Sequence, residues 1–323
     1  MKELKSHFLT KGEQQLFVME PNNQKSAALD FLVTKIRSNK SVFLDWLHQY
    51  GGILFRGFEV DAESDFQKVF QSFSDRSFMD YKDGNSPRSK LTSNIYTSTE
   101  YPKAFRITLH NEMSYTRKWP EKIFFYCHTP AGTGGETPII DSRYLLKLLD
   151  SEMVGDFRDK QVKYTRYLVG KKGFGKTWSE TYETSERSEI ERILTQNGNQ
   201  FFWEDNNLAI SQIGPGTAIH PITGEEVWFN QANQFHPSSL SDDIYHMLKL
   251  LNADNPHRYP HYALFGDDTE ISEGQLREIT EICFDNSIVF KWQKGDVLML
   301  DNMLMAHGRF PYEGERKILV SMS

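Results

Sequence analysis

His110 and Glu112 are the side chains of this sequence whose types and spacing best suit metal chemistry. His110 ends the segment FRITLH (105–110), which reads as a β-strand. Residues i and i+2 of a strand point to the same face, so the imidazole and the carboxylate can reach one point. One further ligand would complete an iron site, and His307, just after the strand-like run DVLML (296–300), is a good candidate.

Two histidines and one carboxylate on one face of an octahedral metal leave three positions open. This is the arrangement that non-haem Fe(II) oxygenases use, and it allows a cosubstrate and O₂ to bind together. Taken alone, a His-x-Glu pattern is weak evidence, because short patterns arise by chance and a strand histidine is more often structural. The metal hypothesis therefore depends on the sequence around these residues.

Two long stretches around these residues carry a family resemblance. They are TSTEYPKAFRITLHNEMSY…WPEKIFFYCHTPAGTGGETPIIDSR, within residues 97–143, and KGDVLMLDNMLMAHGRFPYEGERKILVSM, residues 294–322. Both resemble the TauD/TfdA-like (clavaminate-synthase-like) Fe(II)/2-oxoglutarate-dependent dioxygenases, and most of all the subgroup found alongside nonribosomal peptide pathways. The resemblance runs from about residue 90 to the end. It is specific, because several separated motifs occur in the family's order.

The resemblance implies roles for five positions. It places the iron ligands at His110, Glu112 and His307. It implies that Thr137, in the family's GG(D/E)T segment, holds the far carboxylate of 2-oxoglutarate together with Arg316. A guanidinium suits this role, since it grips a carboxylate with two parallel hydrogen bonds and stays charged. Taken alone, Thr137 could be an ordinary strand threonine and Arg316 a surface charge.

Further candidates surround these five positions. The interval from His307 to Arg316 is shorter than in the best-known family members, which makes Arg309 a rival for the arginine role or a substrate contact. Asn111 and the segment WFNQANQF (228–235) could also contact substrate.

The activity that the resemblance implies is hydroxylation of an unactivated C–H bond. The substrate would be an amino acid or an amino-acid-derived small molecule, free or carried on a peptidyl carrier protein, in antibiotic biosynthesis. O₂ would be consumed and 2-oxoglutarate converted to succinate and CO₂. Desaturation or cyclisation would use the same ligands and stays open as an alternative. Halogenation is not expected, because the related halogenases replace the carboxylate with a small residue and Glu112 is present here.

The main alternative of another class is a nucleotide-binding protein. Gly170–Thr177 (GKKGFGKT) matches the phosphate-binding pattern GxxxxGK[ST]. A P-loop follows a buried parallel strand with a continuous apolar run, whereas QVKYTRYLV (161–169) mixes Lys, Thr and Arg with its apolar residues. His257 and His261 have the spacing of a helical zinc pair, but the prolines beside them disfavour a continuous helix.

The elements that must position these residues change character along the chain. Helical stripes run through 29–36, 43–50 and 66–73, with one strand-like run at 53–58; later helical stripes lie near 145–149, 244–251 and 276–283. Strand-like runs are expected at 105–110, 122–128, 137–141, 162–169, 287–292, 296–300 and 316–322. These patterns favour an α+β fold, and the family implies a double-stranded β-helix (jelly roll) core with flanking helices.

We expect one Fe(II)/2-oxoglutarate dioxygenase domain over 1–323, with a mainly helical part at 1–99 and the jelly-roll core with insertions at 100–323.

The 323 residues carry 37 Lys and Arg against 44 Asp and Glu, a net charge of −7, which disfavours nucleic acid as a partner. No apolar run approaches the ~20 residues of a membrane span, and the start lacks a secretory signal. The distant Cys127 and Cys283 suggest neither a disulfide framework nor a thiolate metal site. The composition therefore predicts a soluble, cytoplasmic protein.

Overall fold

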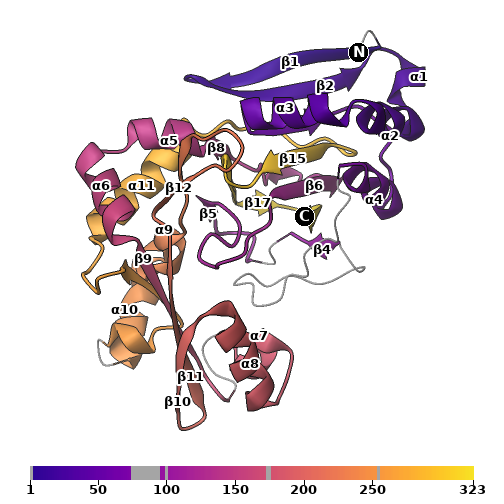
Figure 1. The fold of residues 1–323 in the computed structure, drawn as a ribbon. Helices are drawn as coiled ribbons and strands as arrows, with labels where there is room; N and C mark the ends of the chain where they lie inside the picture. The colour runs from indigo at the N-terminus through magenta and orange to yellow at the C-terminus, as the bar shows by residue number, and fades with distance from the viewer. Residues whose placement is uncertain (1–2, 74–94, 99–100, 172–175, 253–254) are drawn as a thin grey trace.

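The computed structural model describes residues 3–73, 95–98, 101–171, 176–252 and 255–323, arranged as Figure 1 shows. The helices are α1 (Gln24–Ala27), α2 (Leu29–Ser38), α3 (Lys40–Tyr50), α4 (Glu63–Gln71), α5 (Ser142–Leu148), α6 (Ser151–Lys160), α7 (Trp178–Tyr182), α8 (Arg187–Asn197), α9 (Ala232–Phe235), α10 (Asp242–Leu251) and α11 (Glu273–Asn286), with 3-10 turns η1 (Pro237–Ser239) and η2 (Pro256–Arg258). The strands are β1 (Leu4–Lys11), β2 (Gln14–Pro21), β3 (Gly52–Phe55), β4 (Tyr96–Thr97), β5 (Ile107–His110), β6 (Lys122–Thr129), β7 (Thr133–Gly134), β8 (Ile139–Asp141), β9 (Val162–Leu168), β10 (Gln200–Glu204), β11 (Asn207–Gly214), β12 (Thr217–Ile219), β13 (Glu226–Trp228), β14 (His261–Phe265), β15 (Val297–Asp301), β16 (Met305–Arg309), β17 (Tyr312–Glu313) and β18 (Lys317–Met322).

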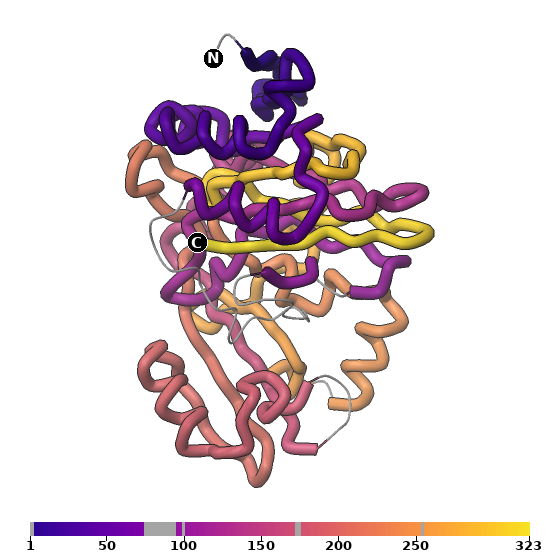
Figure 2. Tube along the Cα trace, turned by 90° about the vertical axis from the view of Figure 1, so that its right-hand side faces the viewer, coloured from indigo at the N-terminus to yellow at the C-terminus, as the bar shows by residue number. Residues whose placement is uncertain are grey.

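Two sheets face each other at the centre of the protein. The main sheet has the strand order β1-β2-β3-β15-β6-β18-β4, and the small sheet has the order β5-β16-β8. Side chains along β15 alternate between two cores, as strand geometry requires. Leu298 and Leu300 share a core with Met305 of the small sheet, whereas Val297 and Met299 pack against α2, α3 and α4. The N-terminal helices therefore cover the face of the main sheet that turns away from the small sheet (Figure 2).

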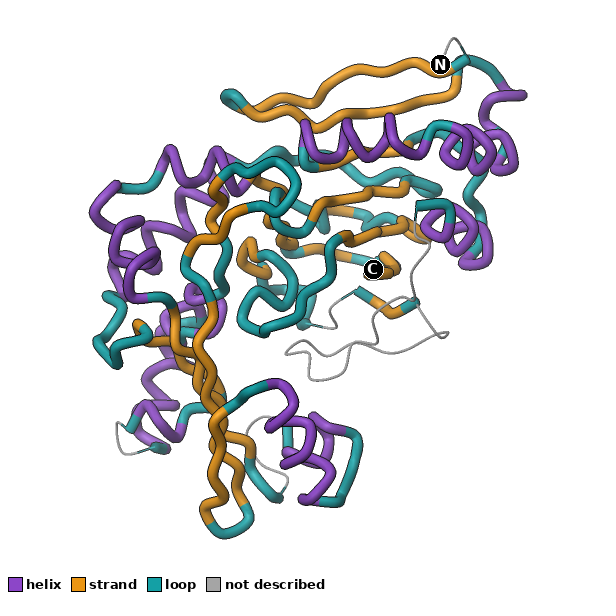
Figure 3. Tube along the Cα trace, viewed as in Figure 1, coloured by secondary structure: helices purple, strands orange, loops and turns teal. Residues whose placement is uncertain are grey.

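A second group of helices covers the outer face of the small sheet. Leu109, Ile140 and Ala306, one from each of its strands, pack in one core with residues of α5, α6, α9 and α11. Helices thus lie on both sides of the central strands, as Figure 3 shows in purple and orange. Residues that point into the space between the two sheets are consequently shielded from water.

The N-terminal part contains the expected helices and also strands that were not expected. α2, α3 and α4 lie at the predicted stripes, and Gly51 ends α3 in the left-handed conformation, with φ at 71°. Before them, β1 and β2 form an antiparallel hairpin, and β2 pairs in parallel with β3. The N-terminal part therefore contributes strands to the main sheet as well as the helices that cover it.

The segment 287–292 does not form the predicted strand. It forms a single backbone bridge, between Ile288 and Ile139, instead of a ladder. Its alternation still has a physical meaning, since Ile288, Phe290 and Trp292 are all buried in the core between the sheets. An extended segment can bury alternate side chains without pairing along its length. The other predicted strands and helices are present, with small shifts at their ends.

The P-loop pattern at Gly170–Thr177 has unsuitable surroundings. Its residues 172–175 lie outside the described residues. The preceding strand β9 pairs antiparallel with both β11 and β14, whereas a P-loop follows a strand of a parallel sheet. Thr177 caps the short helix α7 by accepting from the main-chain N–H of Glu180. These contacts do not support the nucleotide-binding alternative.

The histidine pair His257 and His261 and the two cysteines also have structural explanations in the fold. His257 lies in η2 and His261 in β14, so the two do not share a helix. Cys127 and Cys283 are both free and buried, as expected of small core residues. No helix in the described part of the chain combines the length and the apolar character needed to cross a lipid bilayer.

Candidate metal centre and cosubstrate pocket

His110 and His307 lie opposite each other on neighbouring strands. In the register of the small sheet His110 of β5 pairs with His307 of β16, and their ring centroids are 4.7 Å apart. Their neighbours Leu109 and Ala306 pack in the outer core, so strand alternation turns both imidazoles toward the main sheet. Strand pairing thus brings together two histidines that are far apart in the sequence.

Glu112 completes a group of three buried potential ligands. Its Oε2 lies 4.0 Å from Nε2 of His307. One ligand atom from each of His110, Glu112 and His307 lies within 4.8 Å of the other two. Two imidazoles and one carboxylate at this separation suit a single Fe(II) ion with open coordination positions. Within the described ranges, no other three His, Cys, Asp or Glu side chains are grouped in this way.

A hydrogen bond orients the ring of His110. Its Nδ1 lies 2.8 Å from the main-chain oxygen of Thr108. Because a carbonyl oxygen can only accept, Nδ1 carries the proton and donates it. Nε2 is then the nitrogen that offers a lone pair to a metal, which is the usual way in which a neighbouring group sets the tautomer of a histidine ligand.

Asn302 clamps the backbone of Glu112. Its Oδ1 accepts from the Glu112 N–H at 2.7 Å, and its Nδ2 donates to the carbonyls of Glu112 and Pro120, both at 2.9 Å. In return, Nδ2 of Asn111 donates to the carbonyl of Asn302 at 2.7 Å. Asn302 is fully buried in the turn between β15 and β16. The clamp therefore fixes the position of Glu112 relative to His307, which follows in β16.

We expect Asn302→Ala to weaken Fe(II) binding roughly ten- to a hundredfold, the usual effect of losing a group that orients a metal ligand. The substitution releases the Glu112 main chain and leaves buried N–H and C=O groups without partners. The measurement is the Fe(II) dissociation constant of the folded variant without O₂, beside Ser142→Ala, which removes only a 3.2 Å contact with Asn111. A variant with a lower melting temperature but wild-type Fe(II) affinity would show that the clamp serves folding alone.

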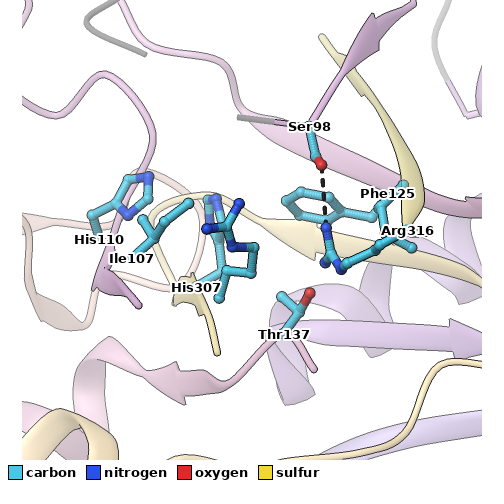
Figure 4. Close-up of a pocket in the computed structure, with 10 residues that line it drawn as sticks. Ser98, Ile107, His110, Phe125, Thr137, His307 and Arg316 are labelled. Atoms are coloured by element: carbon cyan, nitrogen blue, oxygen red, sulfur yellow. Dashed lines mark hydrogen bonds between the residues drawn. The ribbon is translucent and has the colours of Figure 1, made fainter. Parts of the chain in front are cut away.

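A pocket opens beside the two histidines (Figure 4). Its lining residues are Ser98, Ile107, His110, Phe125, Thr137, His307, Gly308, Arg309, Arg316 and Ile318. In Figure 4 His110 lies at one end of this group, while Thr137 and Arg316 lie at the other. Four of the five positions singled out in the sequence line this pocket, and the fifth, Glu112, lies beside His307 without lining it.

The guanidinium of Arg316 reaches this pocket with neutral hydrogen-bond partners. Nε donates to the carbonyl of Gly135 at 2.9 Å, and Nη1 to Oγ of Ser98 at 3.3 Å. Burial, and then repulsion from Arg309, lower the pKa of Arg316 to about 10, so it stays charged at neutral pH. In the part of the chain that the structure describes, no carboxylate forms an ion pair with it. A partly buried charge without a carboxylate partner is stabilised by an anionic ligand.

The glycine pair of the GGET segment makes room for Arg316. Gly134 and Gly135 have φ values of 70° and 73°, in the left-handed region that favours glycine. A Cβ on Gly135 would lie 2.9 Å from Cδ of Arg316, and one on Gly134 would clash with the carbonyl oxygen of Pro311. The turn thus explains why two glycines precede Thr137, whose buried side chain also lines the pocket.

Arg309 lines the same pocket but has other partners. Its Nη1 donates to the carbonyl of Tyr101 at 3.0 Å, and its Nη2 to those of Pro102 and Phe105 at 2.9 and 3.0 Å. Burial lowers its pKa. Arg309 therefore anchors the segment that leads into β5, which makes Arg316 the better placed arginine for a ligand in the pocket.

The two other candidate substrate contacts, Asn111 and the segment 228–235, differ in where they lie. Asn111 is buried, donates within the Asn302 clamp and does not line the pocket, so it fits a positioning role better than a substrate contact. The segment 228–235 does lie beside the metal centre, with Nε2 of Gln234 3.4 Å from Nδ1 of His110. Sequence reasoning missed Ser98, for which no local pattern gave a signal.

The sequence matches the model of a known protein family over most of its length. Residues 24–322 match the model of the family described as taurine catabolism dioxygenase TauD, TfdA family. The chain belongs to the TauD/TfdA family. As a TauD/TfdA protein it is an Fe(II)- and 2-oxoglutarate-dependent dioxygenase, and its cosubstrates are 2-oxoglutarate and O₂.

Two curated relatives agree with this assignment, and one solved structure shares the fold. The dapdiamide synthesis protein DdaC of Enterobacter agglomerans is 36% identical over 277 residues, covering 85% of this chain and 83% of that protein. A clavaminate synthase-like protein of Arabidopsis thaliana is 27% identical over 305 residues, covering 91% of this chain and 88% of that protein. The PvcB protein of Pseudomonas aeruginosa shares the fold, with a TM-score of 0.54 at 13% identity over 98% of this chain and 91% of PvcB.

Proposed function

We propose that this TauD/TfdA protein hydroxylates an unactivated C–H bond of an amino acid or an amino-acid-derived small molecule. In this reaction the substrate gains one oxygen atom of O₂, and 2-oxoglutarate takes the other as it is converted to succinate and CO₂. The observation that carries the proposal is the pocket in which two histidines of a His-Glu-His group meet a partly buried arginine with no carboxylate partner among the described residues.

The metal ligands in this proposal are His110, Glu112 and His307. Their residue types, their burial and the 4.8 Å limit on their separation fit one Fe(II) ion. When bound, Fe(II) with 2-oxoglutarate and O₂ supplies the oxidising power that an unactivated C–H bond requires. The Thr108 carbonyl and the Asn302 clamp hold the ligands in place.

The cosubstrate residues in this proposal are Thr137 and Arg316. 2-Oxoglutarate has two carboxylates, and the one far from the metal needs donors in a buried place. Arg316 offers a charged guanidinium and Thr137 a hydroxyl in the same pocket. Phe125 stands against His307, with ring centroids 5.0 Å apart, and Ile318 adds a second apolar wall. These apolar side chains exclude water from the space between the metal site and Arg316.

The substrate class rests on the likeness to DdaC, a protein of dapdiamide synthesis, and to a clavaminate synthase-like protein. A small molecule of amino-acid type fits biosynthetic relatives of this kind, and a peptidyl carrier protein is a suitable partner to deliver it. We also propose that the two facing sheets form a double-stranded β-helix and that 1–323 is one catalytic domain. The four N-terminal strands within the main sheet support a single unit.

The test is a turnover assay with Fe(II), 2-oxoglutarate and O₂ against free amino acids and the same amino acids loaded on a carrier protein. The expected result is succinate formation that one substrate stimulates, together with a product 16 Da heavier than that substrate. A product 2 Da lighter would replace hydroxylation by desaturation or cyclisation. If neither panel stimulates succinate formation above the level of the His307→Ala variant, the proposed substrate class is wrong.

A further inference from the structure

A buried hydrogen bond joins Trp292 to Thr137 at the cosubstrate end of the pocket. Nε1 of Trp292 lies 3.1 Å from Oγ1 of Thr137. The exposed fractions of the two residues are 7% and 3%. Trp292 does not line the pocket, whereas Thr137 does. One side of the Thr137 hydroxyl is therefore occupied by a residue behind the pocket wall.

The chemistry of the two groups fixes the direction of this bond. An indole N–H can only donate, while a hydroxyl can accept and has one proton to donate. Thr137 must therefore accept from Trp292, and its own proton points elsewhere. Among the described residues no acceptor takes that proton. The pocket that Thr137 lines is where an acceptor can approach it.

We infer that Trp292 is a positioning residue for 2-oxoglutarate, because it holds the Thr137 hydroxyl as a donor toward the far carboxylate. The inference rests on the proposed function, in which Thr137 and Arg316 bind that carboxylate. A hydroxyl already held in its binding orientation loses less freedom when the ligand arrives. A fixed donor also favours a carboxylate, which only accepts, over an amide NH₂, which donates.

The test is a double-mutant cycle on the affinity for 2-oxoglutarate, measured by calorimetry on the Fe(II)-loaded protein without O₂. Trp292→Phe removes the N–H and keeps an aromatic ring, and we expect it to raise the Kd about three- to tenfold, the effect of one neutral hydrogen bond. In the Thr137→Val background the same substitution should change the Kd by less than about twofold, because no hydroxyl remains to be oriented.

Two controls separate orientation from packing. Ser98→Ala removes another hydroxyl of the pocket, and in that background Trp292→Phe should keep its full effect. Phe290→Leu disturbs the ring that packs on Trp292, at 5.0 Å between centroids, and should lower the melting temperature with little change in Kd. If the effect of Trp292→Phe persists in full beside Thr137→Val, the indole acts by packing and the inference fails.

The outcomes also separate this inference from the proposed function. A wild-type protein that does not bind 2-oxoglutarate would overturn both. A wild-type protein that binds it, with Trp292→Phe binding equally well, would overturn the inference alone.

A second measurement does not need a folded Trp292 variant. In protein labelled with ¹⁵N-tryptophan, the indole N–H signals of the six tryptophans can be compared between variants. One signal should move on Thr137→Val, stay near its place on Thr137→Ser, which keeps the hydroxyl, and stay unchanged on Ser98→Ala. If no indole signal responds to Thr137→Val, the proposed bond does not exist in solution.

Discussion

Replacing His110 or Glu112 by alanine is expected to abolish tight Fe(II) binding, a loss of roughly a hundredfold or more in affinity, or about 3 kcal/mol. Each side chain supplies one of three proposed ligands, and within the described ranges no other His, Cys, Asp or Glu joins them to take its place. The main chain at both positions is held independently, by the β5–β16 pairing and by the Asn302 clamp. The fold should therefore survive both substitutions.

The measurement is the Fe(II) dissociation constant of each variant under anaerobic conditions, with circular dichroism to verify folding. His128→Ala is the matched control, because His128 is a histidine of the main sheet whose Nδ1 contacts the hydroxyl of Thr129 at 2.9 Å. It should bind Fe(II) like the wild type. Unchanged affinity in both His110→Ala and Glu112→Ala would remove the proposed ligand group.

Arg316→Ala is expected to weaken 2-oxoglutarate binding by about 2–4 kcal/mol, or roughly thirty- to a thousandfold, the effect of losing charge-assisted hydrogen bonds to a carboxylate. Fe(II) affinity should change little, because the guanidinium lies at the end of the pocket away from His110 (Figure 4). Arg316→Lys keeps the charge but loses the planar fork, so an intermediate loss is expected. The measurement is the Kd of 2-oxoglutarate on the Fe(II)-loaded protein without O₂.

Arg309→Ala is the informative comparison for this prediction. Its guanidinium donates to main-chain carbonyls of Tyr101, Pro102 and Phe105. We expect lower thermal stability and a smaller change in 2-oxoglutarate affinity than in Arg316→Ala. The opposite ranking would assign the cosubstrate arginine to Arg309.

The candidate site could be predicted from the sequence because its motifs are local. The His-x-Glu spacing and the GGET segment each lie within a few residues, although β5 ends at His110 and Glu112 lies in the turn that follows instead of on the predicted strand. What joins them is the register of the small sheet, in which His110 faces His307, and no local pattern encodes that pairing. The family resemblance supplied the connection.

The residues that support the site were harder to find, because their contacts are long-range. Asn302 reaches the Glu112 backbone across 190 residues of sequence, and Trp292 reaches Thr137 across 155. Trp292 stands in the segment 287–292, for which the sequence predicts a strand. The alternate residues Ile288, Phe290 and Trp292 are buried, but the strand-like pattern gives no information about the partner of the indole N–H.

The fold shows the same division between local and long-range information. Helical periodicity identified α2, α3 and α4, since their buried faces repeat within each helix. The hairpin of β1 and β2 was missed, because β1 is largely exposed and carries little apolar alternation. Its place at the edge of the main sheet depends on the pairing of β2 with β3.

The most direct test of the central proposal, an Fe(II) site that opens onto a 2-oxoglutarate pocket, is an anaerobic titration of the metal-free protein. Fe(II) is added first, then 2-oxoglutarate, and the visible spectrum is recorded. The proposal predicts the weak charge-transfer band of a keto acid bound to Fe(II), absent from His110→Ala and shifted to higher 2-oxoglutarate concentration in Arg316→Ala. A wild-type protein that gives no band at saturating Fe(II) and 2-oxoglutarate would contradict it.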